Sequence, residues 1–262
     1  MLLVRTGEKM GQVDTRELVA FLDEHLRREQ IPDTSRNGLQ VQGADTVQRV
    51  GLAVDACLAS YEAAVAAGCE LLVVHHGLIW EGLGAITGPV YRQVKYLVEN
   101  DLNLYAAHLP LDLHPQSGNN IRLARLLDIA DPKPFGAYKG IDIGFRGSLP
   151  EPLPVPRLAD RLRERIGGPN QVLPFGPERV STVGIVSGGG SECMNEAIRK
   201  GIDCLITGEA QHWNHHRALE GAIHVIYAGH YHTETLGVEA LGELLEQRFG
   251  VTSQFLDIPT LV

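Results

Sequence analysis

The chain has 262 residues, a formal net charge of −9 at pH 7, 44% hydrophobic residues and 21% charged residues, which is the balance of a globular protein with one large or two smaller domains. No apolar run approaches the roughly 18 residues of a membrane span, and the apolar stretch at the N-terminus is too short for a secretory signal. The negative charge argues against non-specific nucleic-acid binding, but it does not exclude a nucleotide substrate.

Strand and helix patterns alternate after an N-terminal extension, which we assign to residues 1–11. Asp14 and Glu17 resemble a capping box, and apolar residues at helical spacing predict a helix over 15–28. A polar loop is expected at 33–43. The further elements predicted in the first half are strands at 50–54, 71–74 and 104–107 and helices at 57–67, 90–99 and 119–127.

The middle of the chain departs from this pattern. We predict a linker at 131–134 and a strand at 141–149, and three prolines within 151–156 should interrupt regular structure. The alternation then returns, with predicted helices at 158–166, 192–200 and 235–249 and predicted strands at 183–186, 204–207 and 223–228.

The second half of the chain repeats the first. AGCELLVV at 67–74 aligns with KGIDCLIT at 200–207, and LYAAHLPLD at 104–112 resembles IYAGHYHTE at 226–234. The alternative is chance, because any two strand–helix units share some glycine and apolar placement. We predict an α/β protein of two duplicated α/β lobes folded around one shared site. The predicted lobes are residues 12–130 and 131–262, with a Pro-rich insert around 150–156.

Potential metal ligands follow three apolar runs, each a predicted strand. The carboxyl ends of strands carry the ligand site in open α/β sheets, so we place the site there, between the lobes. The candidates are the adjacent His75 and His76, the pair His108 and Asp112, and the pair His230 and Glu234. Four histidines and two carboxylates could hold two divalent ions at three protein ligands each, with open coordination positions as in catalytic sites.

A purely structural role remains open for each of these candidates. One of the adjacent histidines could be solvated in a turn. Pro110 disfavours a continuing helix, so only a turn could bring His108 and Asp112 together, and Asp112 could instead be a cap. His230 and Glu234 could share one helix face, but Glu234 could also be placed there by the helix dipole.

The segment GEAQHWNHH at 208–216 is dense in polar side chains. We consider His212, Glu209 and His215, in that order, as ligands, proton shuttles or groups that support the ligands, with at least one histidine being inert surface. GGGS at 188–191 could cradle a phosphate, but no Lys follows it, so a tight turn is the better interpretation.

Four cysteines form no CxxC pair, and two of them lie in apolar runs, where a reduced thiol behaves as a small hydrophobe. A disulfide framework is not expected in a chain of this length, so we expect a cytoplasmic protein.

The ordered motifs VVHHGLIW, HLPLD followed by NNIRLARLL, ITGEAQHW and AGHYHTETLGVEAL resemble those of the NIF-three-like, or YbgI-type, dinuclear metal-centre proteins. The NGLQV loop at 37–41 is similar too, and the resemblance covers nearly the whole chain from about Asp14. The resemblance implies a two-lobed α/β/α fold in its compact form, which is often assembled as a toroidal hexamer. It also implies that the protein is a GTP cyclohydrolase 1 type 2 homologue. It also implies the metal ligands His75, His76, Asp112, His230 and Glu234, with Glu234 bridging and His108 a less certain ligand.

These features predict a dinuclear metal-dependent hydrolase that acts on a small molecule, a nucleotide or a phosphoester. His212, Glu209 and His108 are the catalytic candidates, and His212 or Glu209 would move the proton. By resemblance, hydroxide would attack the purine C8 of GTP. Imidazole and carboxylate ligands without thiolate suit Zn, Mn, Fe, Co or Ni. The alternative is a non-enzymatic metal-binding scaffold or regulatory protein that forms a ring.

Overall fold

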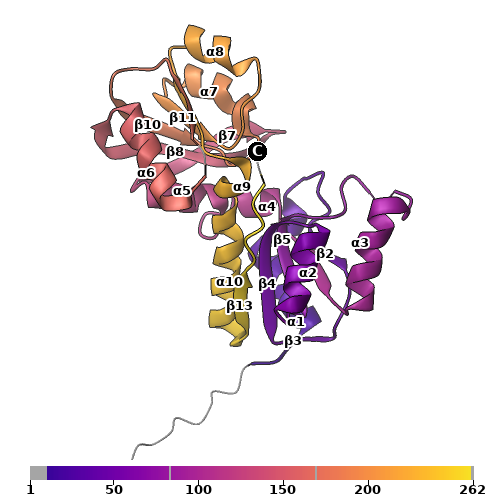
Figure 1. The fold of residues 1–262 in the computed structure, drawn as a ribbon. Coiled ribbons are helices and arrows are strands. Elements are labelled where there is room, and N and C mark those ends of the chain that lie inside the picture. Colours follow the sequence, from indigo (N-terminus) through magenta and orange to yellow (C-terminus); the bar gives the residue numbers. More distant parts are fainter. Residues whose placement is uncertain (1–10, 83, 169, 261–262) are drawn as a thin grey trace, which may run out of the picture. The chain divides into compact units, whose positions relative to one another are not determined.

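The computed structural model describes residues 11–82, 84–168 and 170–260 (Figure 1). The predicted extension at 1–11 lies outside these residues except for Gly11, whose N–H donates to the Gly250 carbonyl at 3.0 Å. The chain folds as two compact units, and each is discontinuous in sequence. Unit 1 comprises the residues up to Ala107 together with 241–258, and unit 2 comprises 108–240 with the last residues of the chain. The predicted lobe boundary at 130 and 131 stays a prediction.

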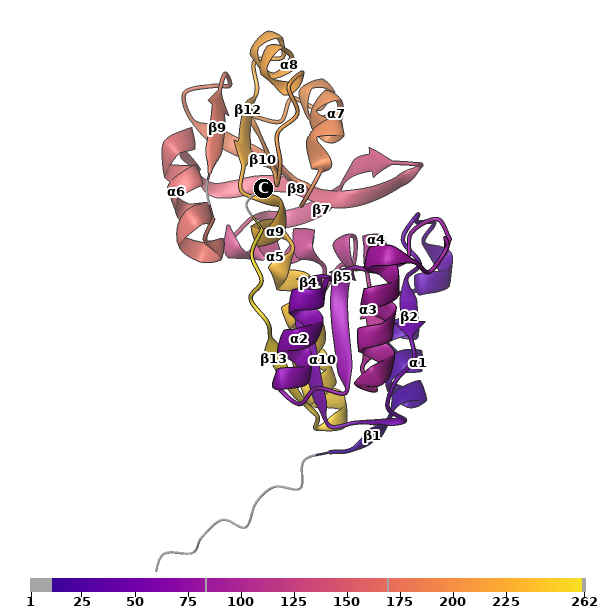
Figure 2. The same ribbon diagram turned by 45° about the vertical axis from the view of Figure 1, so that its right-hand side comes forward.

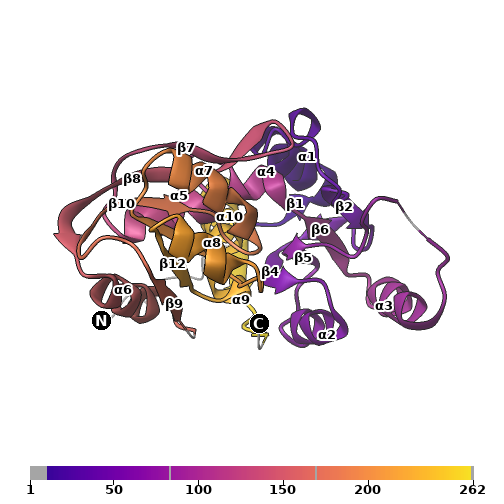
Figure 3. The same cartoon turned by 90° about the horizontal axis from the view of Figure 1, so that it is seen from above.

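Unit 1 is built on a five-stranded sheet of order β13-β4-β5-β6-β2. The first four strands of this order run parallel, and β2 is antiparallel to β6. The four residues LLVV that begin β5 are all buried, as expected of a central parallel strand. Helices α2 and α3 cover one face of the sheet, and α1 lies on the other face with the C-terminal part of α10 (Figures 2 and 3). On that face Phe21 packs edge-on against Phe249, with 5.3 Å between ring centroids.

The elements of unit 1 are β1 Val13–Asp14, α1 Thr15–His25, a 3-10 turn Arg28–Gln30, β2 Gly38–Val41, β3 Thr46–Val47, β4 Arg49–Asp55, α2 Leu58–Ala66, β5 Leu71–His76, α3 Gly88–Glu99, β6 Asn103–Ala106 and β13 Thr252–Phe255. The long helix α10, Thr235–Phe249, has residues in both units. At the start of α1, the Asp14 carboxylate accepts hydrogen bonds from the N–H groups of Arg16 and Glu17, which confirms the predicted cap.

Unit 2 is built on a six-stranded sheet of order β7-β8-β10-β11-β12-β9. Strands β10, β11 and β12 are parallel, and β8 and β9 flank them in antiparallel orientation. Apolar side chains of α5 and α6 pack with those of the parallel strands in one buried core. Helices α7 and α8 lie on the other face (Figures 1 and 2).

The elements of unit 2 are α4 Leu109–Asp112, α5 Asn119–Leu126, β7 Ala130–Tyr138, β8 Ile141–Leu153, α6 Val155–Ile166, β9 Gln171–Pro174, β10 Val180–Ile185, a 3-10 turn Gly190–Cys193, α7 Met194–Arg199, β11 Cys204–Thr207, α8 Asn214–Glu220, β12 His224–Tyr227 and α9 His230–Thr233. Each unit thus has helices on both faces of its sheet, so the predicted α/β/α layers are confirmed.

The two units repeat one structural plan. Each contains three parallel strands in chain order, and the third is flanked by an antiparallel strand, β2 in unit 1 and β9 in unit 2. A carboxylate precedes the second parallel strand in both. Glu70 accepts hydrogen bonds from the N–H groups of Gln48 and Arg49 at 3.0 and 2.9 Å. Asp203, which aligns with Glu70, accepts from Ser181 and Thr182 at 2.8 and 2.9 Å. The predicted duplication is confirmed.

Some predicted irregular segments are regular in the structure. The expected linker at 131–134 is wrong, because these residues belong to β7. This strand is at an edge of the sheet, where a proline interrupts no second ladder. The Pro-rich segment 151–156 interrupts regular structure only at Pro154, between β8 and α6. The polar loop at 33–43 contains strand β2.

In the described part of the chain, no helix has the length and apolar character that a membrane span requires. The four cysteines are free thiols. Burial raises the pKa of Cys69 to about 11 and that of Cys193 to about 12, so these thiols stay protonated at neutral pH and serve as core side chains.

Candidate metal centre

The adjacent histidines of unit 1 are the last two residues of β5. His75 is fully buried, and its Nδ1 lies 2.8 Å from the carbonyl oxygen of Ala107. His76 is directly across from Asp55, the last residue of the parallel strand β4, and its Nδ1 lies 2.8 Å from Asp55 Oδ1. The two imidazoles offer ligand atoms within 4.8 Å of each other. The strand therefore brings both predicted ligands to one end of the sheet, as the sequence indicated.

These hydrogen bonds determine which ring nitrogen can bind a metal. A carbonyl oxygen and a carboxylate only accept, so Nδ1 of both His75 and His76 carries the proton and donates it. In the neutral ring the lone pair is then on Nε2. Metal-binding histidines have this arrangement, in which a carbonyl or carboxylate orients the ring through its other nitrogen.

In unit 2, His230 lies between two carboxylates. It is the first residue of α9, and two residues separate this helix from β12. Its Nδ1 is 3.0 Å from Glu209 Oε2, and its Nε2 is 3.3 Å from Glu234 Oε2. The side chain of Glu234 is 4% exposed, whereas that of Glu209 is 35% exposed. The predicted pair His230 and Glu234 does meet, across the end of the short helix α9.

The two carboxylates make this position favourable for positive charge. Burial lowers the pKa of His230, but the hydrogen bond and charge of Glu234, followed by those of Glu209, raise it to about 9. A proton on the imidazole therefore compensates the carboxylates when no cation does so. A divalent ion bound at Nε2 and at Glu234 would replace that proton.

Asp112 is the second buried carboxylate of unit 2. Its Oδ1 accepts hydrogen bonds from Asn119 Nδ2 at 2.9 Å and from the Ser187 hydroxyl at 3.1 Å. Carboxylate oxygens of Asp112 and Glu234 lie within 4.8 Å of each other, although both residues are at most 5% exposed. Two buried like charges at this distance repel each other unless a cation or a proton lies between them. The donor set of unit 2 therefore fits a divalent metal ion.

Gly188 makes room for these ligands. It lies in the glycine-rich turn after β10 with a φ of +57°, and its N–H donates to the Thr233 hydroxyl at 3.0 Å. A Cβ atom at this position would lie 2.1 Å from Glu234 Oε1 and 2.8 Å from His230 Nε2. The backbone of this turn thus packs directly against the side chains of Glu234 and His230, and any side chain at position 188 would displace them.

The other candidates have different surroundings. His108 is half-buried and caps the N-terminus of α4, and its carbonyl oxygen accepts the Asp112 N–H at 3.1 Å. Glu209 contacts a predicted ligand, His230, through the 3.0 Å pair with its Nδ1. His212 and His215 are exposed, and His215 packs edge-on against Phe175. Within the described residues, no hydrogen bond joins His212 to a predicted ligand.

Several residues that hydrogen-bond to the candidate ligands were missed by the sequence analysis. They are Asp55, Asn119, Asn120 and Ser187. Asp55 is the last residue of β4, and Ser187 follows β10 after one intervening residue. A polar side chain at or just after the end of a parallel strand is the same signal that identified the histidines. Asn120 connects Ser187 with the candidate ligand Asp112, because its Oδ1 accepts the Ser187 N–H at 2.7 Å and its Nδ2 donates to the Asp112 carbonyl at 3.3 Å.

Comparisons with known proteins agree with this description. The relatives include the protein named GTP cyclohydrolase 1 type 2 homolog of Archaeoglobus fulgidus, 46% identical over 244 residues, covering 93% of this chain and 98% of the relative. The protein of the same name from Deinococcus radiodurans is 45% identical over 250 residues and covers 95% of each chain.

Solved structures are similar as well. Protein ybgI, described as of unknown function, is 37% identical with a TM-score of 0.90, covering 95% of this chain and all of that one. A protein of Thermus thermophilus is 43% identical with a TM-score of 0.89 and the same coverage. The model of the family Duf34/NIF3 (NGG1p interacting factor 3) matches residues 13–260, so the chain belongs to this family, as its motifs indicated.

Proposed function

We propose that this protein is a metal-dependent hydrolase that binds two divalent ions, with a nucleotide or another phosphoester as its substrate. The proposed ligands are His75, His76, Asp112, His230 and Glu234. Zn, Mn, Fe, Co and Ni all suit this mixture of imidazole and carboxylate groups.

One observation carries the proposal. All three histidines have Nδ1 bound to a fixed acceptor, which is a backbone carbonyl for His75, Asp55 for His76 and Glu209 for His230. A buried histidine outside the site can also have partners, as His224 does on both ring nitrogens, but it does not share this choice of an acceptor on Nδ1. The same choice in both units supports metal binding through Nε2, with Asp55 and Glu209 as residues that position the rings.

When bound, the two ions would lower the pKa of a coordinated water and polarise the reacting centre of the substrate. The protein's own groups would move protons. Glu209 is partly exposed, so it can exchange protons with solvent while it orients His230. His212 is exposed on the loop after β11, and we propose it for proton transfer; His108 is the third catalytic candidate.

The substrate class rests on the relatives. Their shared name, GTP cyclohydrolase 1 type 2 homolog, favours a purine nucleotide. For that substrate we propose that water is added at C8. The net charge of −9 would repel such an anion, so the bound ions would have to supply the local positive charge. Hydrolysis of a different phosphoester would use the same groups.

A second candidate function is a metal-stabilised scaffold that forms a ring and binds partner proteins. The family's description as an interacting factor favours it. In that case the ions would stabilise the fold, and no substrate would be turned over.

Elemental analysis of the purified protein, followed by a hydrolysis screen of nucleotides and phosphoesters with and without chelator, tests the proposal. We expect about two ions per chain and turnover that chelation abolishes. Bound metal without turnover of any substrate would favour the scaffold, and absence of metal after reconstitution would contradict both functions.

A further inference from the structure

The chain has two tryptophans, and the duplication places them at equivalent positions. Trp80 lies 13 residues beyond the start of AGCELLVV at 67, and Trp213 lies 13 residues beyond the start of KGIDCLIT at 200. Each follows the second parallel strand of its unit, β5 or β11, and each is 38% exposed. His76 lies four residues before Trp80, and Glu209 lies four residues before Trp213. Both tryptophans therefore belong to the segments that carry the candidate site.

The exposed surface of Trp80 is not needed to hydrate its polar group. Its Nε1–H donates to the Gly77 carbonyl at 2.9 Å, so the donor of the indole is satisfied within the same turn. Single exposed apolar side chains are common on proteins, and exposure alone does not define a site. What distinguishes Trp80 is the way its backbone is fixed and the group that lies beside its ring.

The backbone around Trp80 is fixed by the polar loop at 33–43. Ser35 forms an antiparallel bridge with Trp80. The N–H of Arg36 donates to the Ile79 carbonyl at 3.0 Å, and Gln40 Oε1 accepts the Ile79 N–H at 3.0 Å. The indole therefore extends from a backbone that the neighbouring loop holds in place.

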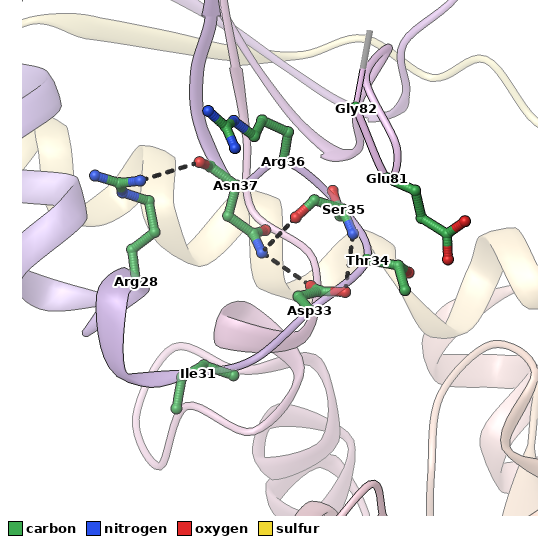
Figure 4. A pocket seen from close by; sticks show the side chains of 9 residues that line it. All are labelled: Arg28, Ile31, Asp33, Thr34, Ser35, Arg36, Asn37, Glu81 and Gly82. Carbon is green, nitrogen blue, oxygen red and sulfur yellow. Dashed lines mark hydrogen bonds between the residues drawn. The ribbon is translucent and has the colours of Figure 1, made fainter. Parts of the chain in front are cut away.

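The polar loop is itself held in shape, beside a cavity of about 390 Å³ (Figure 4). The Asp33 carboxylate accepts the Ser35 N–H at 3.1 Å and an Asn37 side-chain N–H at 2.9 Å. Glu81, the residue after the tryptophan, donates its N–H to the Thr34 carbonyl at 2.7 Å. A side chain that extends from such a fixed segment loses little further freedom when a ligand binds, which favours affinity.

The ring of Trp80 lies next to a candidate metal ligand. Its centroid is 6.2 Å from that of His76, with 41° between the two ring planes. His76 is held through Nδ1 by Asp55, so its Nε2 has the lone pair that would bind an ion. A planar group that rests on the indole would therefore be a neighbour of the ion proposed at His76.

The equivalent tryptophan of unit 2 has a different neighbour. The Arg217 guanidinium lies 4.7 Å from the centroid of the Trp213 ring, so a side chain of α8 covers one face of this ring. Trp80 instead has a candidate metal ligand beside it. This difference selects Trp80 as the position for a ligand ring and makes Trp213 a suitable comparison.

We propose that Trp80 stacks on the planar heteroaromatic ring of the substrate and so holds a nucleobase next to His76. Every base has a flat π-face, and an indole offers it a large flat surface, so stacking fixes where the ring lies whichever base is bound. The inference rests on the proposed function, because it assigns the stacked ring to the substrate of that site. Stacking itself requires no turnover.

The test compares guanosine monophosphate (GMP) with ribose phosphate, which lacks the base, on the full-length protein reconstituted with Zn²⁺. Because the chain has two tryptophans, Trp213→Phe leaves Trp80 as the one source of tryptophan fluorescence. GMP should quench this emission, and ribose phosphate should not. In the Trp80→Phe protein, the emission of Trp213 should not change when GMP is added.

Titration calorimetry measures the affinity itself. Trp80→Leu should weaken GMP binding by about ten-fold or more, as is typical for loss of base–aromatic stacking. Trp80→Phe should retain part of the affinity, because it keeps a flat ring. The matched control is Tyr91→Leu, which removes an exposed aromatic ring of α3 and should bind GMP like the unmodified protein. Both leucine variants should keep their full metal content.

Each other outcome overturns the inference. Equal GMP affinity of the Trp80→Leu and Tyr91→Leu proteins, or absence of GMP binding, would remove Trp80 from substrate binding. Quenching of Trp80 by ribose phosphate would show that the base is not what contacts the ring. Loss of metal from the Trp80→Leu protein would make the indole a packing partner of His76 instead. Failure of the proposed function looks different: GMP would bind and quench Trp80 as expected, while the reconstituted protein would hydrolyse nothing.

Discussion

At the scale of single residues, the site depends on hydrogen bonds that hold side chains in position before any ion arrives. The Nδ1 atoms of His75, His76 and His230 are each within 3.0 Å of an acceptor, so the rings have little freedom to turn. Asp112 is held in a similar way by Asn119 and Ser187. Preorganisation of this kind lowers the cost of ordering ligands when a metal binds, and loss of one such support costs typically about 10- to 100-fold in metal affinity.

The first prediction separates a ligand from its support. Glu234→Gln should lower the metal content of the dialysed protein more than Glu209→Gln does, because Glu234 is buried against His230 and lies close to Asp112, whereas Glu209 acts through His230. Inductively coupled plasma mass spectrometry measures this content. Glu62→Gln, on the exposed face of α2, is the control and should retain all metal. Equal metal content in the Glu234 and Glu209 variants would contradict the ranking.

At the scale of elements, parallel strands and the turns after them deliver the candidate ligands and their supports. β5 ends on His75 and His76, β4 ends on Asp55, and α9 begins two residues after β12. The turn after β10 has a glycine, Gly188, at a position where the candidate ligands leave no space for a side chain. A side chain at Gly188 would occupy the positions of Glu234 and His230, so this turn is as important for the site as the ligands themselves.

The second prediction tests that turn. Gly188→Ala should lower metal occupancy by at least about ten-fold, since the new methyl group displaces the Glu234 carboxylate. The matched control is Gly201→Ala. Gly201 also has a positive φ, +63°, but a Cβ there would meet nothing within 4 Å. Gly201→Ala should lose about 1–2 kcal/mol of folding stability from backbone strain, measured by urea unfolding, and Gly188→Ala should lose at least as much, because its methyl group also clashes with Glu234. Normal metal content in the Gly188 variant would refute the role of the turn.

The sequence predicted the central elements well and the peripheral ones poorly. Buried parallel strands such as β11 are continuous apolar runs, so their pattern is visible in the sequence, and the prediction at 204–207 matches the observed strand. β2, β9 and β13 were not predicted, because short flanking strands are half-exposed and have no continuous apolar run. The prolines of β7 looked like a linker because an edge strand tolerates residues that a central strand does not.

The same distinction holds for the site. The candidate ligands could be proposed from the sequence because packing at the end of a buried strand seldom requires a His or carboxylate side chain, and their role as ligands stays a prediction. Their hydrogen-bond partners could not, because a partner is set by strand order rather than by spacing along one strand. Asp55 reaches His76 only because β4 is paired with β5 in a register that puts the two residues side by side. The i,i+4 spacing of His230 and Glu234 was the exception, since both residues belong to one local segment.

At the scale of the whole molecule, the proposed assembly is the property to test. The third prediction is a closed homo-oligomer, a hexamer by resemblance to the family. Multi-angle light scattering under native conditions should return a multiple of the 28.6 kDa chain mass, near six-fold. The control is the same measurement after chelation, which distinguishes assembly from metal bridging between chains. A mass of about 29 kDa would exclude a stable oligomer.

The last prediction distinguishes an enzyme from a scaffold. If the protein is a hydrolase, chelation should abolish turnover and a divalent ion should restore it. The rate should rise with pH through the pKa of the metal-bound water, which is about 7 for a strongly polarised water. His212→Ala should lower turnover by about 10²-fold or more, as for loss of a proton-transfer group, while both metals stay bound. His216→Ala, a neighbouring exposed histidine, is the control and should leave turnover unchanged. A scaffold gives the opposite pattern, in which chelation lowers the melting temperature and His212→Ala changes nothing measurable. Loss of metal from the His212→Ala protein would instead make this residue a ligand, since only a ligand or its direct support holds the ion in place.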